Sequence, residues 1–339
     1  MRLEKVLIIQ TAFIGDVILA TPLIENLHAL SSETQIDVLV SEQNTSLLQS
    51  HPKVRHTYGW DKKKRKYADL LPLIQTFRRN HYDLVVNCHR FGTSGLLTAC
   101  SGGGVKVGFR KNPFSFAYDL KVDHRFADDV HEVDRNLSLL SALFPTTDPG
   151  QWQRRPRLYP SENDARHVQS YQQGAYVCIA PTSVWHTKQF PPEQWAKLIE
   201  ALPSDCLIYL LGSRQDHPHC ERIRQMAQRR VHNIAGHLTL LQSAQLMEGA
   251  LINYVNDSAP LHLASATNAP VCAVYCSTVP GFGFYPLSDI SWVVEAPEAL
   301  NCRPCGIHGH RACPEGHFRC AYDITTQQLV RAYQEAVTC

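Results

Sequence analysis

Three short polar stretches carry the side chains of this sequence that could do chemistry, and each follows an apolar run. The first is Ile14-Gly15-Asp16, in which Gly15 permits a tight turn and Asp16 supplies a carboxylate. At the carboxyl end of a strand, this carboxylate could take a proton from an attacking hydroxyl group. It could also cap the following helix, and the residue types alone favour the cap.

The second stretch, Pro181–Pro191, combines two hydroxyl groups with a cation. Thr182, Ser183 and Lys188 are the side-chain types that a diphosphate clamp requires. Lys188 could neutralise the charge of a departing nucleotide diphosphate. A lone lysine is more often an exposed surface residue, so both interpretations stay open at this point.

The third stretch, Leu251–Cys276, is typical of a strand, a polar turn, a short helix and a second strand. The turn directs backbone N–H groups and the positive end of a helix toward one point, which favours a phosphate. Ser258 fits that use, whereas Asp257 would repel a phosphate and is expected to orient a loop or bind a hydroxyl group. His262, one turn into the helix, is equally consistent with a hydrogen-bonded core histidine.

The elements that must position these residues alternate between strands and helices along the whole chain. Strands are predicted at 5–11, 36–40, 84–87, 105–109, 176–180, 207–211, 251–255 and 271–275. Helices are predicted at 17–30, 67–80, 131–144, 193–202, 220–229 and 325–337, with a further short helix that starts after the polar turn 256–258 and is stopped by 268–270. This alternation predicts an α/β protein with doubly wound parallel sheets. The Pro-rich segment 145–160 has the composition of a linker, so two domains are expected, 1–155 and 156–339. Ligands of such sheets bind at the carboxyl ends of the strands, which predicts an active site in a cleft between the two domains.

Composition excludes several classes of protein. The chain is 44% hydrophobic and 19% charged, as in globular proteins, and no apolar run approaches the ~20 residues of a membrane span. The first residues do not form a signal peptide, so a cytoplasmic protein is expected. Neither G-x-G-x-x-G nor G-x-x-x-x-G-K-[ST] occurs, so the usual dinucleotide and P-loop signatures are absent.

Charge is unevenly distributed along the chain. The net charge is +2, yet residues 51–111 contain 13 lysines and arginines against three acidic residues. A basic segment of this kind indicates a polyanionic partner or, with about equal weight, a solvated surface.

Four pieces of the sequence together resemble glycosyltransferase family nine, the ADP-heptose–lipopolysaccharide heptosyltransferases, and are closest in character to the heptosyltransferase II-like members. The pieces are IGDVILATPLIENL (14–27), HEVDRNLSLL (131–140), PTSVWHTKQFPPEQWAKLI (181–199) and NDSAPLHLASATNAPVCAVY (256–275). The resemblance implies a GT-B fold, which consists of two Rossmann-like domains. It assigns the acceptor to the N-terminal domain and the nucleotide sugar to the C-terminal domain.

The same resemblance implies roles for individual residues. Asp16 corresponds to the catalytic base, which reverses the preference for a simple cap. The implied donor-binding set comprises Thr182, Ser183, Lys188, Asp257, Ser258, Ala259 and His262. Its second half follows the family pattern D-[ST]-G-x-x-H except at Ala259, where the family has glycine. An alanine methyl group would crowd a phosphate that approaches the backbone.

The reaction implied is a single displacement with inversion, in which L-glycero-D-manno-heptose passes from ADP-heptose to a hydroxyl group of the lipopolysaccharide inner core. No Asp-x-Asp occurs in the chain, so no catalytic metal is expected. The acceptor, including its lipid A part, and an anionic membrane surface are expected to meet the basic residues, and no nucleic acid partner is expected. A peripheral position at the inner face of the inner membrane would follow. The acceptor-binding candidates are Lys62, Lys63, Lys64, Arg65, Lys66, Arg110 and Lys111.

A cysteine cluster occupies the loop 301–320, which belongs to the C-terminal domain and precedes the terminal helix. Cys302, Cys305, Cys313 and Cys320 have the spacing C-x₂-C-x₇-C-x₆-C. Four soft ligands on a Gly- and Pro-containing loop suit structural zinc or iron, with free thiols or later disulfides as alternatives. The distance of the cluster from the three polar stretches along the chain favours a role in stability over one in chemistry.

Three alternatives to a heptosyltransferase remain at this stage. The first is a GT-B protein that uses another nucleotide sugar. The second is a nucleotide-sugar epimerase, although only Asp16 is an obvious acid–base group. The third is a binding protein for nucleotide or glycan that does not catalyse transfer.

Overall fold

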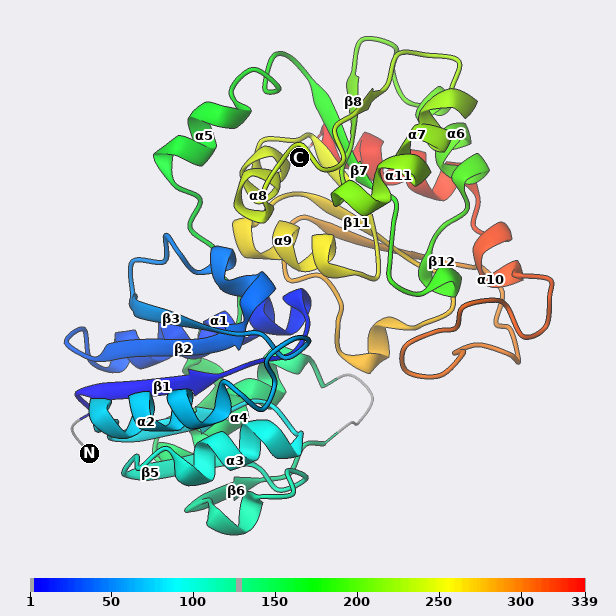
Figure 1. Ribbon diagram of the computed structural model, residues 1–339. Coiled ribbons are helices and arrows are strands. Elements are labelled where there is room, and N and C mark those ends of the chain that lie inside the picture. The colour runs from blue at the N-terminus through cyan, green and yellow to red at the C-terminus, as the bar shows by residue number, and fades with distance from the viewer. Residues whose placement is uncertain (1–2, 126–129, 339) are drawn as a thin grey trace. The chain divides into compact units, whose positions relative to one another are not determined.

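The computed structural model describes residues 3–125 and 130–338. The chain divides into two compact units, Met1–Tyr159 and Pro160–Cys339, so the division falls four residues after the predicted boundary. Each unit contains one six-stranded parallel sheet flanked by helices (Figure 1). The predicted α/β class with two doubly wound sheets is confirmed.

The sheet of the first unit has the strand order β3-β2-β1-β4-β5-β6. Its strands are β1 (Lys5–Ile9), β2 (Gln35–Ser41), β3 (Val54–Trp60), β4 (Leu84–Asn87), β5 (Val105–Phe109) and β6 (Leu120–Val122), and its helices are α1 (Ile14–Leu30), α2 (Leu70–Asn80), α3 (Gly92–Cys100) and α4 (Glu132–Leu143).

The second unit repeats this plan with the strand order β12-β11-β10-β7-β8-β9. Its strands are β7 (Tyr176–Ala180), β8 (Leu207–Leu210), β9 (His232–Asn233), β10 (Ile252–Asn256), β11 (Val271–Tyr275) and β12 (Ser291–Glu295). Its helices are α5 (Glu162–Val168), α6 (Pro192–Ala201), α7 (His217–Met226), α8 (Leu240–Glu248), α9 (Ala259–Thr267), α10 (Arg319–Tyr322) and α11 (Thr326–Ala336).

The strand order places one switch point in each sheet. In the first unit the chain leaves β1 toward β2 and later returns to pair β4 with the other side of β1. In the second unit β7 likewise lies between β8 and β10. Crevices at such switch points, outside the carboxyl ends of the strands, are where doubly wound sheets bind ligands. The loops that follow β1, β4, β7 and β10 are therefore the ones that can build a site.

Buried apolar runs explain why the central strands were predictable. Strands β4, β7, β10 and β11 are buried at every residue, as expected for parallel strands covered by helices on both faces. The thiols of Cys88, Cys178, Cys272 and Cys276 are buried, as predicted for small apolar side chains.

The sequence-based prediction for the start of α1 was wrong. The helix begins at Ile14 and not at Val17, because the extended backbone of Phe13 forms the N-cap. Asp16 therefore lies at the third position of the helix and not in a loop. Its carboxylate accepts a hydrogen bond from the Phe13 N–H at 3.1 Å, which satisfies one of the free donors of the first turn.

Candidate functional site

The surroundings of Asp16, in the first unit, shift the pKa of its carboxyl group. Burial and, after it, the negative charge of Glu132 raise the pKa of its carboxyl group to about 7, against the opposing effects of the hydrogen bond from Phe13 and the positive charge of Arg90. The residue as a whole keeps some exposure to solvent, but its carboxyl group is packed against protein atoms, and this packing raises the pKa. A carboxylate with a pKa near neutrality is well matched to general-base catalysis.

Glu132 opens α4 and holds a buried negative charge. Its carboxylate accepts a hydrogen bond from Arg135 Nη1 at 2.8 Å, and His124 Nε2 lies 3.7 Å away. Burial opposes ionisation of Glu132, but these two partners lower its pKa. The preceding His131 caps the helix through Nδ1, which accepts from the Val133 N–H at 3.1 Å. Glu132 stayed outside the predicted site although it lies in the quoted piece HEVDRNLSLL. Its burial, which sets it apart, is not visible in the sequence.

Lys62, in the basic segment 51–111, forms hydrogen bonds with Thr11 in the loop between β1 and α1. Its ammonium donates to the backbone oxygen of Thr11 at 2.6 Å and to Thr11 Oγ1 at 3.2 Å. Burial lowers the pKa of Lys62, and Thr11 Oγ1 also lies 3.3 Å from His89 Nδ1. Lys62 therefore has a structural contact within the first unit, whereas Lys63 and Lys64 are exposed.

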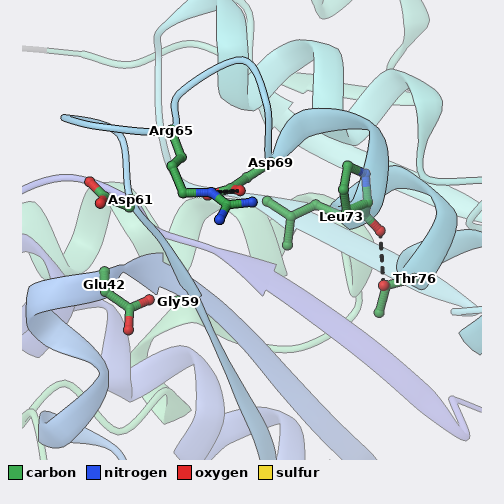
Figure 2. A pocket seen from close by; sticks show the side chains of 8 residues that line it. Glu42, Gly59, Asp61, Arg65, Asp69, Leu73 and Thr76 are labelled. Carbon is green, nitrogen blue, oxygen red and sulfur yellow. Dashed lines mark hydrogen bonds and ion pairs between the residues drawn. The ribbon is translucent and has the colours of Figure 1, made fainter.

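Two of the other predicted acceptor-binding cations are already paired. Arg65 donates to Asp69 at 2.8 Å, and Arg110 donates to Asp123 at 3.0 Å. Figure 2 shows the Arg65 side chain in a cavity of about 470 Å³, which is lined by Glu42, Gly59, Asp61, Arg65, Asp69, Pro72, Leu73 and Thr76. Three carboxylates against one guanidinium make this cavity unsuited to a polyanion.

In the second unit, Lys188 and Asp257 form a nearly buried ion pair. The Lys188 ammonium lies 2.6 Å from Asp257 Oδ2, and their side chains are 15% and 9% exposed. Thr278, in the segment that follows β11, donates its hydroxyl hydrogen to the same oxygen at 2.6 Å. Asp257 thus holds both the Lys188 ammonium and the Thr278 hydroxyl group. Thr278 stayed outside the predicted site, and no local pattern marked it.

Ser258 joins the two loops of the second unit. It is the N-cap of α9, and its hydroxyl group donates to the backbone oxygen of Thr182 at 3.3 Å. Ala259 is the first residue of the helix and is partly exposed. His262 is buried one turn further, with its ring 6.2 Å from that of Phe284. The loops after β7 and β10 therefore converge, as the switch point requires.

Ser183 lies on the same loop as Thr182 and is partly exposed. Its backbone oxygen accepts a hydrogen bond from Gln189 Nε2 at 2.6 Å, which closes the loop on itself. The structure thus places Thr182 and Ser183, the Lys188–Asp257 pair and the N-terminus of α9 within one loop cluster.

The cysteine loop contains thiols near one another but no assembled ligand set. Cys305 Sγ lies 3.1 Å from the backbone oxygen of Cys302, and Cys302 Sγ lies 4.0 Å from His317 Nε2. Within residues 3–125 and 130–338, no three His, Cys, Asp or Glu side chains are gathered as a metal ion would require. The metal site, which also includes Cys313 and Cys320, stays a prediction.

No helix in the part of the chain that the structure describes is long and apolar enough to cross a membrane.

Comparison with known proteins identifies the family. The model of glycosyltransferase family 9 (heptosyltransferase) matches residues 70–313. The chain belongs to this family. Lipopolysaccharide heptosyltransferase 3 of Escherichia coli strain K12 is 28% identical over 78% of this chain and 80% of its own length.

Two solved structures share the fold of this glycosyltransferase. The family 9 glycosyltransferase of Veillonella parvula matches with a TM-score of 0.84 and 18% identity, over 99% of this chain and 97% of its own. The E. coli heptosyltransferase WaaC, solved with ADP, matches with a TM-score of 0.74 and 20% identity, over 98% and 99%. The predicted GT-B fold and the predicted glycosyltransferase class are both confirmed.

Proposed function

We propose that this family 9 glycosyltransferase transfers L-glycero-D-manno-heptose from ADP-heptose to a hydroxyl group of the lipopolysaccharide inner core. The observation that carries the proposal is the Lys188–Asp257 pair, held beside the N-terminus of α9 at the switch point of the second sheet. A cation and a helix N-terminus at one point are complementary to a diphosphate. Support comes from the similarity to lipopolysaccharide heptosyltransferase 3 of E. coli and to the heptosyltransferase WaaC, which was solved with ADP.

In the first unit, Asp16 acts as the general base. Its carboxylate takes the proton of the acceptor hydroxyl group while that oxygen forms a bond to the anomeric carbon of the heptose. Attack from the face opposite the diphosphate gives inversion. With a pKa of about 7, Asp16 is ionised in a large fraction of molecules at neutral pH and still basic enough to accept the proton.

In the second unit, the loop cluster holds the donor and stabilises its leaving group. As the bond between the anomeric carbon and the phosphate oxygen breaks, negative charge grows on the ADP. Lys188 and the N–H groups at the start of α9 face that charge, with Thr182, Ser183 and Ser258 as hydrogen-bond donors. The Ala259 methyl group narrows the approach to these N–H groups. The sequence contains no Asp-x-Asp, so the proposal includes no catalytic metal.

The exposed cations Lys63, Lys64 and Lys111, with the neighbouring Lys66, provide the attraction for the anionic acceptor and for an anionic lipid surface. Arg65 and Arg110 are left out of this set because each pairs with a carboxylate. Each lysine or arginine near such a surface contributes ~1 kcal/mol. A cytoplasmic enzyme that docks peripherally at the inner face of the inner membrane fits these features. The cysteine loop is proposed to hold a structural zinc or iron ion away from the transfer step.

One incubation separates this function from its alternatives. The purified protein is mixed with ADP-heptose and lipopolysaccharide that lacks the heptose. Heptose transfer supports the proposal, whereas isomerised ADP-sugar supports an epimerase. Binding without either product supports a non-catalytic protein. A second incubation with another nucleotide sugar in place of ADP-heptose tests the identity of the donor.

A further inference from the structure

The cysteine loop packs directly against the segment that carries Lys188, although more than 100 residues separate them in sequence. Thr187 is 1% exposed, and its Oγ1 accepts a hydrogen bond from the backbone N–H of His310 at 2.7 Å. In return, the Thr187 N–H donates to the backbone oxygen of His310 at 3.1 Å. Two reciprocal hydrogen bonds thus hold the residue next to Lys188 onto the loop.

Gly309 makes this close approach possible. Its φ of +78° is favourable for glycine, and a Cβ at this position would lie 2.9 Å from Thr187 Oγ1 and 3.2 Å from Lys188 Cγ. A side chain here would therefore press on the stem of Lys188. The loop backbone forms one wall of the space in which that stem lies.

The same loop also forms hydrogen bonds with the segment 276–278, which includes the Thr278 that binds Asp257. Arg303 donates to the backbone oxygens of Cys276 at 2.7 Å and Thr278 at 2.6 Å. The N–H of Cys305 donates to the backbone oxygen of Ser277 at 2.8 Å. Thr278 is the residue whose hydroxyl group binds Asp257, so the loop contacts the neighbours of both members of the ion pair.

We propose that the segment Arg303–His310 is a positioning element of the donor site, and that Thr187 is the residue through which it holds Lys188. This inference rests on the proposed role of Lys188 in binding the donor diphosphate. A lysine stem is flexible, and fixing it before the ligand arrives reduces the entropy lost on binding. A role in donor affinity is thereby added to the role in stability that is expected of the cysteine loop.

Three threonine variants test the inference. Thr187→Val removes the acceptor of the His310 N–H while keeping the shape of the side chain, and Thr187→Ser keeps the oxygen. Thr267→Val is the matched control, because the Thr267 hydroxyl group bonds only to carbonyls of its own helix at the far end of α9. All variants are compared by Tm, by Kd for ADP and by steady-state kinetics with ADP-heptose.

Thr187→Val is expected to raise the Kd for ADP and the KM for ADP-heptose by about three- to tenfold, with kcat changed less than about twofold. Thr187→Ser is expected to restore most of the affinity, and Thr267→Val to leave it unchanged. A purely structural role of Thr187 would instead lower Tm without separating KM from kcat. Unchanged ADP affinity in folded Thr187→Val overturns the inference.

Two further variants keep the inference distinguishable from the proposed function. Gly309→Ala disturbs the same contact from the side of the cysteine loop. It replaces Thr187→Val as the test if the Thr187→Val protein does not fold. Unchanged ADP affinity in folded Gly309→Ala also overturns the inference. Lys188→Ala tests the proposed function itself. If ADP binding is weaker in Lys188→Ala but normal in Thr187→Val and Gly309→Ala, the inference is overturned and the proposed function stands. Normal binding in Lys188→Ala overturns both.

Discussion

Lys188 and Asp257 lie 69 residues apart in sequence, yet the Lys188 ammonium is 2.6 Å from the Asp257 carboxylate. The two residues follow β7 and β10, which pair in parallel through Ala180 and Val255. The pairing of these strands brings both loops to one edge of the sheet. An anionic ligand at this edge meets a lysine whose position is already fixed by a carboxylate.

Replacing Lys188 should weaken ADP binding more than it weakens the fold. Lys188→Ala removes the cation that faces the diphosphate, so we expect the Kd for ADP to rise by more than about tenfold, in keeping with the loss of a charge-assisted contact. Lys197→Ala removes an exposed lysine from α6 in the same unit and serves as the control. Isothermal titration with ADP measures both, and equal affinities for the two variants would contradict the role of Lys188.

The pH dependence of transfer should depend on Glu132. Asp16 must be ionised to act as a base, so kcat/KM should fall as the pH drops below about 7, where its carboxyl group takes up a proton. Glu132→Gln removes a negative charge that raises the pKa of Asp16, so this acidic limb should move to lower pH. Gln can still accept the hydrogen bond from Arg135.

Asp134→Asn is the control for Glu132→Gln, because Asp134 lies on the same helix but pairs with Arg154 at the surface. Its pH profile should match that of the unmodified protein. A limb that stays in place in Glu132→Gln would show that Glu132 does not act on the catalytic base.

Binding to the acceptor should weaken with salt and with loss of the exposed lysines. The double variant Lys63→Ala/Lys64→Ala removes two exposed cations. Each cation contributes ~1 kcal/mol at an anionic lipid surface, so binding to anionic vesicles should fall by about tenfold or more. Salt should weaken the binding of the unmodified protein in the same direction. Co-sedimentation with vesicles measures both effects, and vesicle binding that salt does not change would contradict this role of the basic segment.

The cysteine loop gives a prediction about metal content. Protein purified without chelator should carry about one zinc or iron ion per chain, because four thiols at this spacing suit a tetrahedral site. Cys302→Ser/Cys305→Ser should lose that metal. Elemental analysis decides the question, and a metal-free protein whose thiols all react with a thiol reagent would contradict the prediction.

The central strands of both sheets were predictable from sequence, and the edge strands were not. Strand β7 was predicted with its observed bounds because YVCIA is an unbroken apolar run. Strand β3 has the sequence VRHTYGW and is mostly not buried, so no apolar run marked it. Strands β6, β9 and β12 were also not predicted from the sequence, nor were helices α3, α5 and α8. Strands β6 and β9 are short, and α5 has only two buried residues, so these elements have no clear apolar pattern.

The candidate site was predictable where it depended on local sequence. Asp16, Lys188 and Ser258 each come soon after a central strand. Residue types alone suggested phosphate binding around Lys188 and Ser258, whereas the role of Asp16 as a base was predicted only from the family resemblance. The partners Glu132 and Thr278 reach the site only through tertiary packing of α4 and through the strand order. The spacing of residues along the chain does not predict such tertiary contacts.

The measurement that tests the central claim most directly is heptose transfer by Asp16→Asn. The amide can still accept the hydrogen bond from the Phe13 N–H, so the start of α1 should persist while the base is lost. With ADP-heptose and lipopolysaccharide that lacks the heptose, we predict that the unmodified protein transfers heptose and that turnover by Asp16→Asn falls about 10²–10⁴-fold with ADP affinity retained. Undiminished transfer by Asp16→Asn, or no transfer by the unmodified protein, would contradict the account.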